Sequence, residues 1–193
     1  MPLPPSVENL LKQSETGQAA LKYFNDNKLD LETKTEGAIA YFDPGDGAAR
    51  KKKMVLNTSK PAAMVAAYFC HEMYHAKMNI TGNTGDAKKD TQDDYVEKMV
   101  QEEADGTAIG FRCYYELEKK GLATGTAPDR YDFYKRAVEA GQKSAGTADP
   151  DAAGFTKGTK MARALINDRF LGPNAIQSYS EYYKRDWVLQ NRN

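Results

Sequence analysis

The feature that most constrains this chain is the stretch 61–78, PAAMVAAYFCHEMYHAKM, which carries both of its histidines. Ala and Met dominate it, and Pro61 suits the first turn of a helix. His71 and His75 lie four residues apart, slightly more than one helical turn. They therefore project from one face, close enough to share a metal ion. Glu72 is rotated by about 100° from His71 and can reach a water beside that ion.

Zinc suits this ligand set, because imidazole binds Zn²⁺ well and the ion lowers the pKa of a bound water towards 7. The run His71-Glu72-Met73-Tyr74-His75 resembles the H-E-x-x-H signature of the zincin metallopeptidases. The resemblance in pattern covers about residues 38–120, and its specific part is 71–75. It implies that Glu72 acts as general base while zinc-bound water hydrolyses a peptide or protein substrate. The alternative is two ordinary histidines on a surface or core helix.

A second helix, predicted from about Asp93 to Lys120, offers the third zinc ligand. Its apolar stripe consists of Val96, Met99, Val100, Thr107, Gly110, Phe111, Tyr114 and Leu117. At 100° per residue, Glu103 falls near the middle of this stripe, Glu102 lies at its edge and Asp105 points to the opposite side. A carboxylate inside an apolar stripe is costly unless it is paired or bound to a metal. We therefore expect Glu103 to be the ligand, with Glu102 as the second choice.

The segment 101–106, QEEADG, resembles the second motif of the Glu-type zincins, the gluzincins, which often reads E-A-D or E-x-x-A-D. Gln101 stands where the first Glu of the longer form would be. In an Asp-type zincin, Asp105 would be the ligand instead. Gly106 and Gly110 would let the motif helix approach closely. The alternative is a pair of solvated glutamates on an ordinary helix.

The pattern predicts an α+β fold in one domain spanning 1–193, and the resemblance implies that it is zincin-like. A strand at 28–33 and a hairpin at 37–57 form a small sheet, which is expected to lie with the motif helix on one side of a cleft. The resemblance also implies that the edge strand holds an extended substrate, although a plain scaffold hairpin fits the pattern equally well. The other side is mainly helical, with helices predicted at 131–140, 160–171 and 175–189. Residues 1–5 are expected to be a flexible lead without a core to join, and Ser6 to cap the first helix.

The Gly- and Ala-rich segment 141–158 is expected to be a disordered loop or a lid over the site. Tyr114 and Arg112 are open candidates for stabilising the oxyanion. The aromatic residues of the last predicted helix are assigned to core packing or helix docking rather than to ligand binding. Cys70 and Cys113 are expected to be buried free thiols, unless the two helices touch there and allow a bridge.

Charge and hydropathy narrow the function further. The chain has 27 basic and 27 acidic residues, which argues against a nucleic-acid partner. It has no transmembrane stretch, and its start lacks the features of a signal peptide. We therefore expect a protein that is cytoplasmic as synthesised or exported by a signal-independent route. The resemblance is strongest to compact bacterial effector and toxin metallopeptidase domains, with an immunity or delivery partner unknown. A non-catalytic, zinc-containing binding module is the alternative function.

Overall fold

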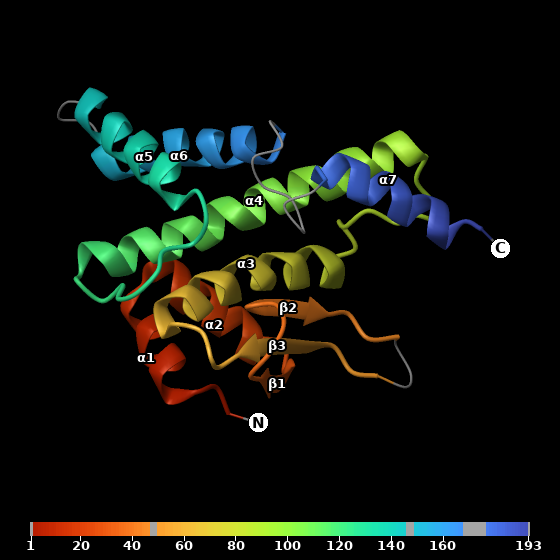
Figure 1. Ribbon diagram of the computed structural model, residues 1–193, viewed down its shortest axis with the longest axis horizontal. Helices are drawn as coiled ribbons and strands as arrows, with labels where there is room; N and C mark the ends of the chain where they lie inside the picture. Colours follow the sequence, from red (N-terminus) through yellow and green to blue (C-terminus); the bar gives the residue numbers. More distant parts are fainter. Residues whose placement is uncertain (1, 47–49, 146–148, 168–176, 193) are drawn as a thin grey trace.

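A long central helix, α4 (Gln92–Lys119), organises the structure, a computed structural model that describes residues 2–46, 50–145, 149–167 and 177–192 (Figure 1). Thr91 caps its start by accepting a hydrogen bond from the backbone N–H of Asp94, and Asp93 and Asp94 complement the helix dipole. The helix ends before Gly121, whose positive φ of 71° suits glycine. These signals place α4 within one residue of its predicted bounds.

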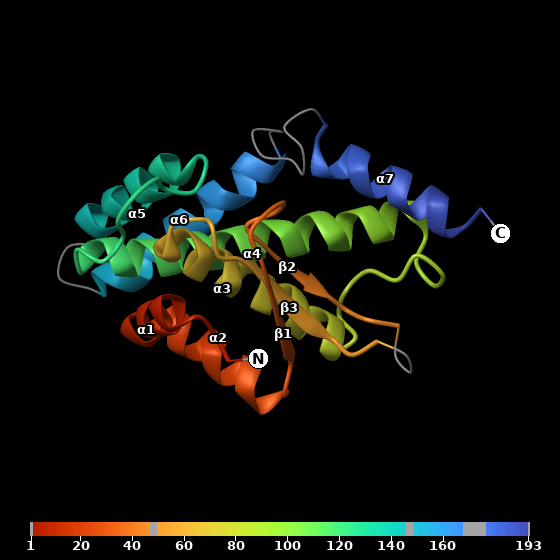
Figure 2. The same cartoon turned by 60° about the horizontal axis from the view of Figure 1, so that its bottom comes forward.

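The fold is α+β and mostly helical. The other elements are α1 (Pro5–Gln13), α2 (Glu15–Asp26), β1 (Asp30–Lys34), β2 (Ala40–Asp43), β3 (Lys53–Asn57), α3 (Ala62–Ile80), α5 (Tyr131–Ser144), α6 (Pro150–Asn167) and α7 (Tyr179–Gln190). Helix α3 packs along α4 and also contacts α1, α2 and the sheet. On the other side of α4 lie the α5–α6 pair and α7, at opposite ends of the molecule (Figures 1 and 2).

The small sheet has the strand order β1-β3-β2. β1 pairs with β3 in parallel and β2 pairs with β3 antiparallel, so the predicted hairpin is present with β2 at one edge. The central strand carries three consecutive buried residues, Met54, Val55 and Leu56, of which Met54 and Leu56 share one face and belong to the main hydrophobic core. β2 lies against α3, which brings an unpaired strand edge next to the motif helix.

The start of the chain corrects one expectation. Leu3 is buried against the main hydrophobic core, so the lead does have a core to join. Helix α1 begins at Pro5 after Pro4, and Ser6 is not its cap. Ser14 ends α1 and caps α2, its hydroxyl accepting a hydrogen bond from the N–H of Gly17. The two short helices are therefore separate, and Ser14 lies at the junction between them.

The predicted loop at 141–158 is also wrong for the part that the structure describes. α5 continues to Ser144 and α6 begins at Pro150. The glycines of this segment serve helix packing: a Cβ on Gly141 would lie 2.7 Å from the backbone oxygen of Ala153. One on Gly158 would lie 2.7 Å from the ring of Tyr134. Small residues here permit a close helix crossing, which is the reason that the segment looked poor in core residues.

Some predicted helix ends lie outside the described residues. The structure describes α6 as far as Asn167, so the predicted helix end at 168–171 lies outside the described residues. Residues 175 and 176, the predicted start of the last helix, also lie outside them. Within the described part, no helix is long and apolar enough to cross a membrane.

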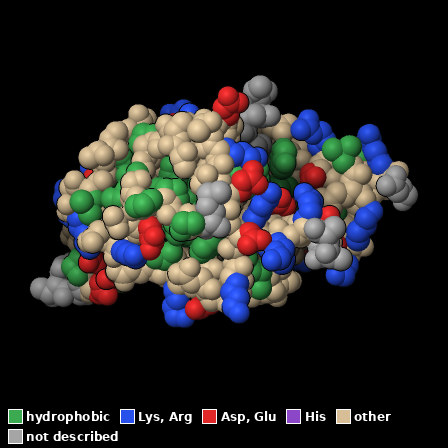
Figure 3. All heavy atoms as spheres, turned by 90° about the horizontal axis from the view of Figure 1, so that it is seen from below, with side chains coloured by type: hydrophobic (Ala, Val, Ile, Leu, Met, Phe, Trp, Pro, Cys, Tyr) green, Lys and Arg blue, Asp and Glu red, His purple; other side chains and the backbone are tan. Residues whose placement is uncertain are grey.

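On the face seen in Figure 3, basic side chains lie among acidic ones and do not form a continuous basic patch. Cys70 and Cys113 are both buried and free, as expected.

Candidate metal centre

The site begins with the close contact between α3 and α4, which two glycines of α4 permit. A Cβ on Gly110 would lie 3.0 Å from the backbone oxygen of Ala67 and 3.3 Å from the Cβ of His71. A Cβ on Gly106 would lie 3.3 Å from His71 Nε2. Because both positions lack a side chain, the imidazole of His71 packs directly against α4. The expectation that the motif helix approaches α4 at these glycines is confirmed.

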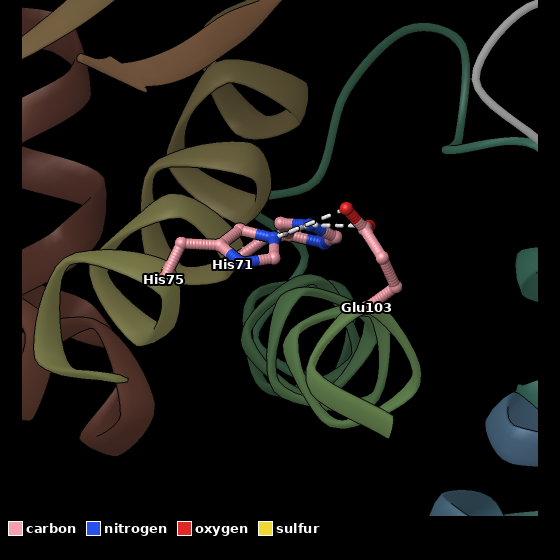
Figure 4. A group of neighbouring side chains, drawn as sticks. All are labelled: His71, His75 and Glu103. Carbon is pink, nitrogen blue, oxygen red and sulfur yellow. Dashed lines mark hydrogen bonds and ion pairs between the residues drawn. The ribbon is translucent and has the colours of Figure 1, made fainter. Parts of the chain in front are cut away.

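Three side chains with metal-binding atoms converge between these helices. His71 and His75 of α3 point towards Glu103 of α4 (Figure 4). The Nε2 atoms of the two histidines are 2.9 Å apart. His71 Nε2 lies 3.5 Å from Glu103 Oε2, and His75 Nε2 lies 3.7 Å from Glu103 Oε1. One atom from each residue thus falls within a group spanning 4.8 Å.

This donor set fits a zinc ion. Two imidazole nitrogens and one carboxylate oxygen are a common zinc ligand set that leaves a further position open. Tetrahedral ligands at about 2.0–2.2 Å from a metal lie about 3.3–3.6 Å from one another. The closest approaches between the three side chains, 2.9–3.7 Å, bracket that range, and they involve both oxygens of Glu103. With one atom from each residue the group lies within 4.8 Å, so the side chains would have to adjust for all three to bind one ion.

Glu102 takes a different place from its neighbour. Its Oε1 lies 2.7 Å from His75 Nδ1, and the side chain is only 4% exposed. A carboxylate that accepts the Nδ1–H of a histidine leaves Nε2 as the metal-binding nitrogen and fixes the ring. Oε2 of Glu102 is buried without a hydrogen-bond partner among the described residues. Glu102 thus lies behind His75 and orients it, whereas Glu103 faces the metal position.

Asp105, the third carboxylate considered, points away from the site. Its Oδ1 accepts hydrogen bonds from Nε and Nη2 of Arg163 on α6, at 3.0 and 2.8 Å. Its Oδ2 accepts one from the hydroxyl of Tyr74 at 3.3 Å. Asp105 therefore ties α4 to α6 and α3, and the geometry does not favour it as a metal ligand.

The charges of the candidate metal-binding side chains depend on one another. Burial alone would raise the pKa of Glu103, but hydrogen bonds and charge attraction from His71 and His75 outweigh it and hold that pKa well below its usual range. Burial would lower the pKa of His75, but the carboxylates of Glu102 and Glu103 outweigh it and raise that pKa well above its ordinary value. The site thus stabilises positive charge at its centre.

Glu72 lies in the wall beside this group. Its Oε2 accepts a hydrogen bond of 3.0 Å from the backbone N–H of Phe42 on β2. Desolvation raises the pKa of the Glu72 carboxyl above its usual range, although the nearby His71 and His75 act in the opposite direction. A carboxyl with a raised pKa is a better proton acceptor than an exposed one. Its position and pKa both suit a group that exchanges a proton with a bound reactant.

The edge of β2 presents its backbone to the same space. Because the N–H of Asn57 donates to the carbonyl oxygen of Ile39, alternate residues of β2 face β3 in this antiparallel pair. The N–H and C=O groups of Ala40 and Phe42 therefore face the open edge, and the contact from Phe42 to Glu72 agrees with this alternation. An extended segment lying beside β2 could pair with the N–H and C=O of Ala40 and with the C=O of Phe42, whereas the N–H of Phe42 already donates to Glu72.

An open cleft of about 960 Å³ joins these parts. The strand edge from Gly37 to Pro44, the four residues of the candidate centre and the first helix turns around Pro61 and Met64 line it. So do three aromatic residues of α7: Tyr179, Tyr182 and Tyr183. The lining thus includes residues of the strand edge on one side and the candidate centre on the other.

The two candidates for oxyanion stabilisation do not reach this cleft. The ring of Tyr114 packs against Tyr131, with centroids 4.8 Å apart. The guanidinium of Arg112 pairs with Glu116, 2.9 Å from Nε to Oε1. Three tyrosines of α7 line the cleft instead, so the prediction that its aromatic residues serve only core packing or helix docking was incomplete. Helical spacing showed that they share a face, but not which part of the chain that face meets.

The candidate centre is thus assembled from α3, α4 and the edge of β2, with α7 as a further wall. Its four central side chains come from two helices. The hydroxyl of Tyr183 on α7 also donates a hydrogen bond to Glu103, 80 residues away in sequence. No protein-family model, curated protein or solved structure matches this chain.

Proposed function

We propose that this chain is a zinc-dependent metallopeptidase with a zincin-like fold, acting on an extended peptide or protein segment. The observation that carries the proposal is the convergence of His71, His75 and Glu103 beside Glu72 in a cleft bordered by an open strand edge. A metal set, a proton acceptor and a peptide-binding edge are the parts that peptide hydrolysis requires.

Each residue has a distinct role in this proposal. His71, His75 and Glu103 hold the zinc ion, and Glu102 fixes the ring of His75. When bound, zinc polarises a peptide carbonyl and acidifies the attacking water. The carboxylate of Glu72 takes a proton from that water and delivers it to the nitrogen of the leaving amine. The raised pKa of Glu72 suits both transfers, because the group accepts the proton readily and can return it.

The strand edge would select the conformation of the substrate. Ala40 offers its backbone N–H and C=O, and Phe42 its C=O, on the side of the cleft that faces Glu72, while the N–H of Phe42 is bonded to Glu72. A substrate in extended conformation would add to the sheet as a further strand, with main-chain hydrogen bonds that do not depend on its sequence. We infer a requirement for unstructured segments, since a folded helix could not pair with this edge.

One observation favours the second candidate, a zinc-containing binding module without catalysis. The Glu72 carboxylate already accepts a hydrogen bond from Phe42, so it ties α3 to β2 and has a structural use. A purely structural zinc site, however, does not need a carboxylate directly beside the metal position. A variant that keeps the shape of Glu72 but loses its basicity separates the two functions.

Glu72→Gln provides this test. We expect zinc content near that of the wild type, because Glu72 is not among the metal-binding atoms, and a loss of turnover of roughly 10²–10⁴-fold. Zinc would be measured by elemental analysis, and turnover by cleavage of a fluorogenic library of unstructured peptides. Glu97→Gln, an exposed change on α4, is the control. Wild-type turnover in a zinc-loaded Glu72→Gln protein would refute the catalytic role, and binding without cleavage by the wild type would favour the binding module.

A further inference from the structure

Helix α7 is anchored to the first half of α4 rather than to the main core. Tyr95, Val96 and Ala87 form with Tyr183 a small hydrophobic cluster separate from the main one, and Trp187 packs at its border. A capping box between Ser178 and Glu181 starts the helix. The helix therefore has its own docking surface on the element that carries Glu103.

Polar contacts complete this docking. The hydroxyl of Tyr95 donates to Asp186 Oδ2 at 2.6 Å. The indole N–H of Trp187 donates to the backbone oxygen of Asp90 at 3.2 Å, and the side-chain amide of Asn191 donates to that of Ala87 at 2.7 Å. These contacts lie along the helix and hold it in one rotational setting, which determines where its tyrosines point.

Two of those tyrosines reach the candidate metal centre: Tyr179 lies close enough for the charge of Glu103 to add to burial in raising its pKa, and Tyr183 makes a direct hydrogen bond. The hydroxyl of Tyr183 donates a buried hydrogen bond of 2.6 Å to Glu103 Oε1. The ring is 6% exposed and is held by neighbouring rings, edge-on to Tyr95 and Tyr182 and stacked with Tyr179. Its phenol oxygen is therefore a fixed donor.

We propose that Tyr183 is a positioning residue for the metal centre, which holds one oxygen of Glu103 and leaves the other for the metal. This inference rests on the proposed zinc site. A glutamate side chain is flexible, and ordering it costs conformational entropy. The bond from Tyr183 supplies that order before the metal arrives, while Glu102 does the same for His75.

The chain contains a matched control for this role. Tyr95 and Tyr183 are both buried, and each donates a hydrogen bond of 2.6 Å to a carboxylate. The partner of Tyr95 is Asp186, which lies away from the centre and docks α7, and Tyr95 does not line the cleft. Removing either hydroxyl costs a hydrogen bond of 2.6 Å to a carboxylate, part-buried at Tyr95 and buried at Tyr183, but only the change at Tyr183 removes a donor from Glu103.

The experiment compares Tyr183→Phe with Tyr95→Phe and the wild type in the purified full-length chain. Zinc affinity would be measured by competition with a chromophoric chelator, and the visible spectrum of the Co²⁺-loaded protein would report coordination geometry. We expect Tyr183→Phe to bind zinc roughly 10- to 100-fold more weakly, the usual effect of losing a partner of a metal ligand, and to show an altered Co²⁺ spectrum. Tyr95→Phe should match the wild type in both. Melting of the metal-free proteins verifies that all three are folded.

Two results would overturn the inference: Tyr183→Phe binding zinc as tightly as the wild type, or an equal loss in both variants, which would indicate a loosened α7. These results are independent of catalysis. Zinc binding with the expected difference but without peptide cleavage would remove the proposed function and leave the role of Tyr183 in place. Failure of the wild type to bind zinc would remove both.

Discussion

At the scale of residues, the adjacent glutamates Glu102 and Glu103 of α4 are expected to have different roles at the candidate metal centre. Glu103 faces both histidines, with its carboxylate oxygens 3.5 and 3.7 Å from their Nε2 atoms. Glu102 contacts only the far side of His75, at Nδ1. The helical rotation of about 100° between neighbours is enough to send one carboxylate to the metal position and the other behind its ligand.

This division predicts graded losses of zinc affinity. Glu103→Gln should cause the largest loss, since a proposed ligand is replaced by a weakly binding amide. Glu102→Gln should weaken zinc binding by a smaller factor, roughly 10- to 100-fold, because the orientation of His75 is no longer fixed. Glu97→Gln on the same helix should have no effect, as its side chain is exposed. Isothermal titration with zinc would measure all three, and a larger loss in Glu102→Gln than in Glu103→Gln would contradict the assignment.

The sequence predicted much of this site because its information is local. The spacing of His71 and His75 depends only on helix geometry, and the phase of Glu103 follows from the apolar stripe around it. Tyr183 was missed because its contact with Glu103 crosses 80 residues, and the position of α7 depends on docking contacts that no periodicity reveals. The sequence also offers Glu102 as a ligand. Its contact with Nδ1 of His75 could not be predicted, because that contact depends on the side-chain rotamer of His75.

At the scale of elements, the α5–α6 pair shows how composition misleads when glycine serves packing. Gly141 and Gly154 face each other across the pair, with a Cβ on Gly141 placed 2.7 Å from the Cα of Gly154. Both glycines are buried. Residue counting favours a loop wherever glycine is frequent, because glycine is poor in helices. The close crossing outweighs that preference here, since it lets two helix backbones touch.

Gly141→Ala tests this explanation. The contact atoms are backbone and cannot move aside, so we expect a loss of about 1–3 kcal/mol in the free energy of unfolding from overpacking. In an uncrowded helix the same change would stabilise the protein by about 0.5–1 kcal/mol. The reverse change at the exposed neighbour, Ala140→Gly, calibrates helix propensity alone. Urea unfolding of both variants measures the effect, and a more stable Gly141→Ala protein would show that the crossing is not tight.

At the scale of the whole molecule, α4 contacts helices that are far apart in sequence, from α1 and α2 to α7. Its Glu116 side chain, 13% exposed, meets the junction of α1 and α2. It accepts hydrogen bonds from the Ser14 hydroxyl at 2.7 Å and from the backbone N–H and hydroxyl of Thr16 at 2.9 and 2.8 Å. Arg112 completes the set from one turn earlier on α4. This one carboxylate therefore connects the N-terminal helices to the helix that carries Glu103.

The link at Glu116 predicts how stability depends on pH. Burial would raise the pKa of Glu116, but the hydrogen bonds from Ser14, Thr16 and Arg112 outweigh it and hold that pKa below its ordinary value. A depressed pKa in the folded state means stabilisation that is fully present above the unfolded pKa of about 4.3 and is lost as the pH falls through the folded pKa. Glu116→Gln should therefore lower the free energy of unfolding by about 1–3 kcal/mol at pH 7, because charge-assisted hydrogen bonds are lost.

The difference from the wild type should shrink in acid, whereas the exposed change Glu97→Gln should have little effect at either pH. Urea unfolding followed by circular dichroism at a series of pH values gives these differences directly. A gap between wild type and Glu116→Gln that stays constant into acid would mean that the carboxylate charge contributes nothing to holding the N-terminal helices on α4.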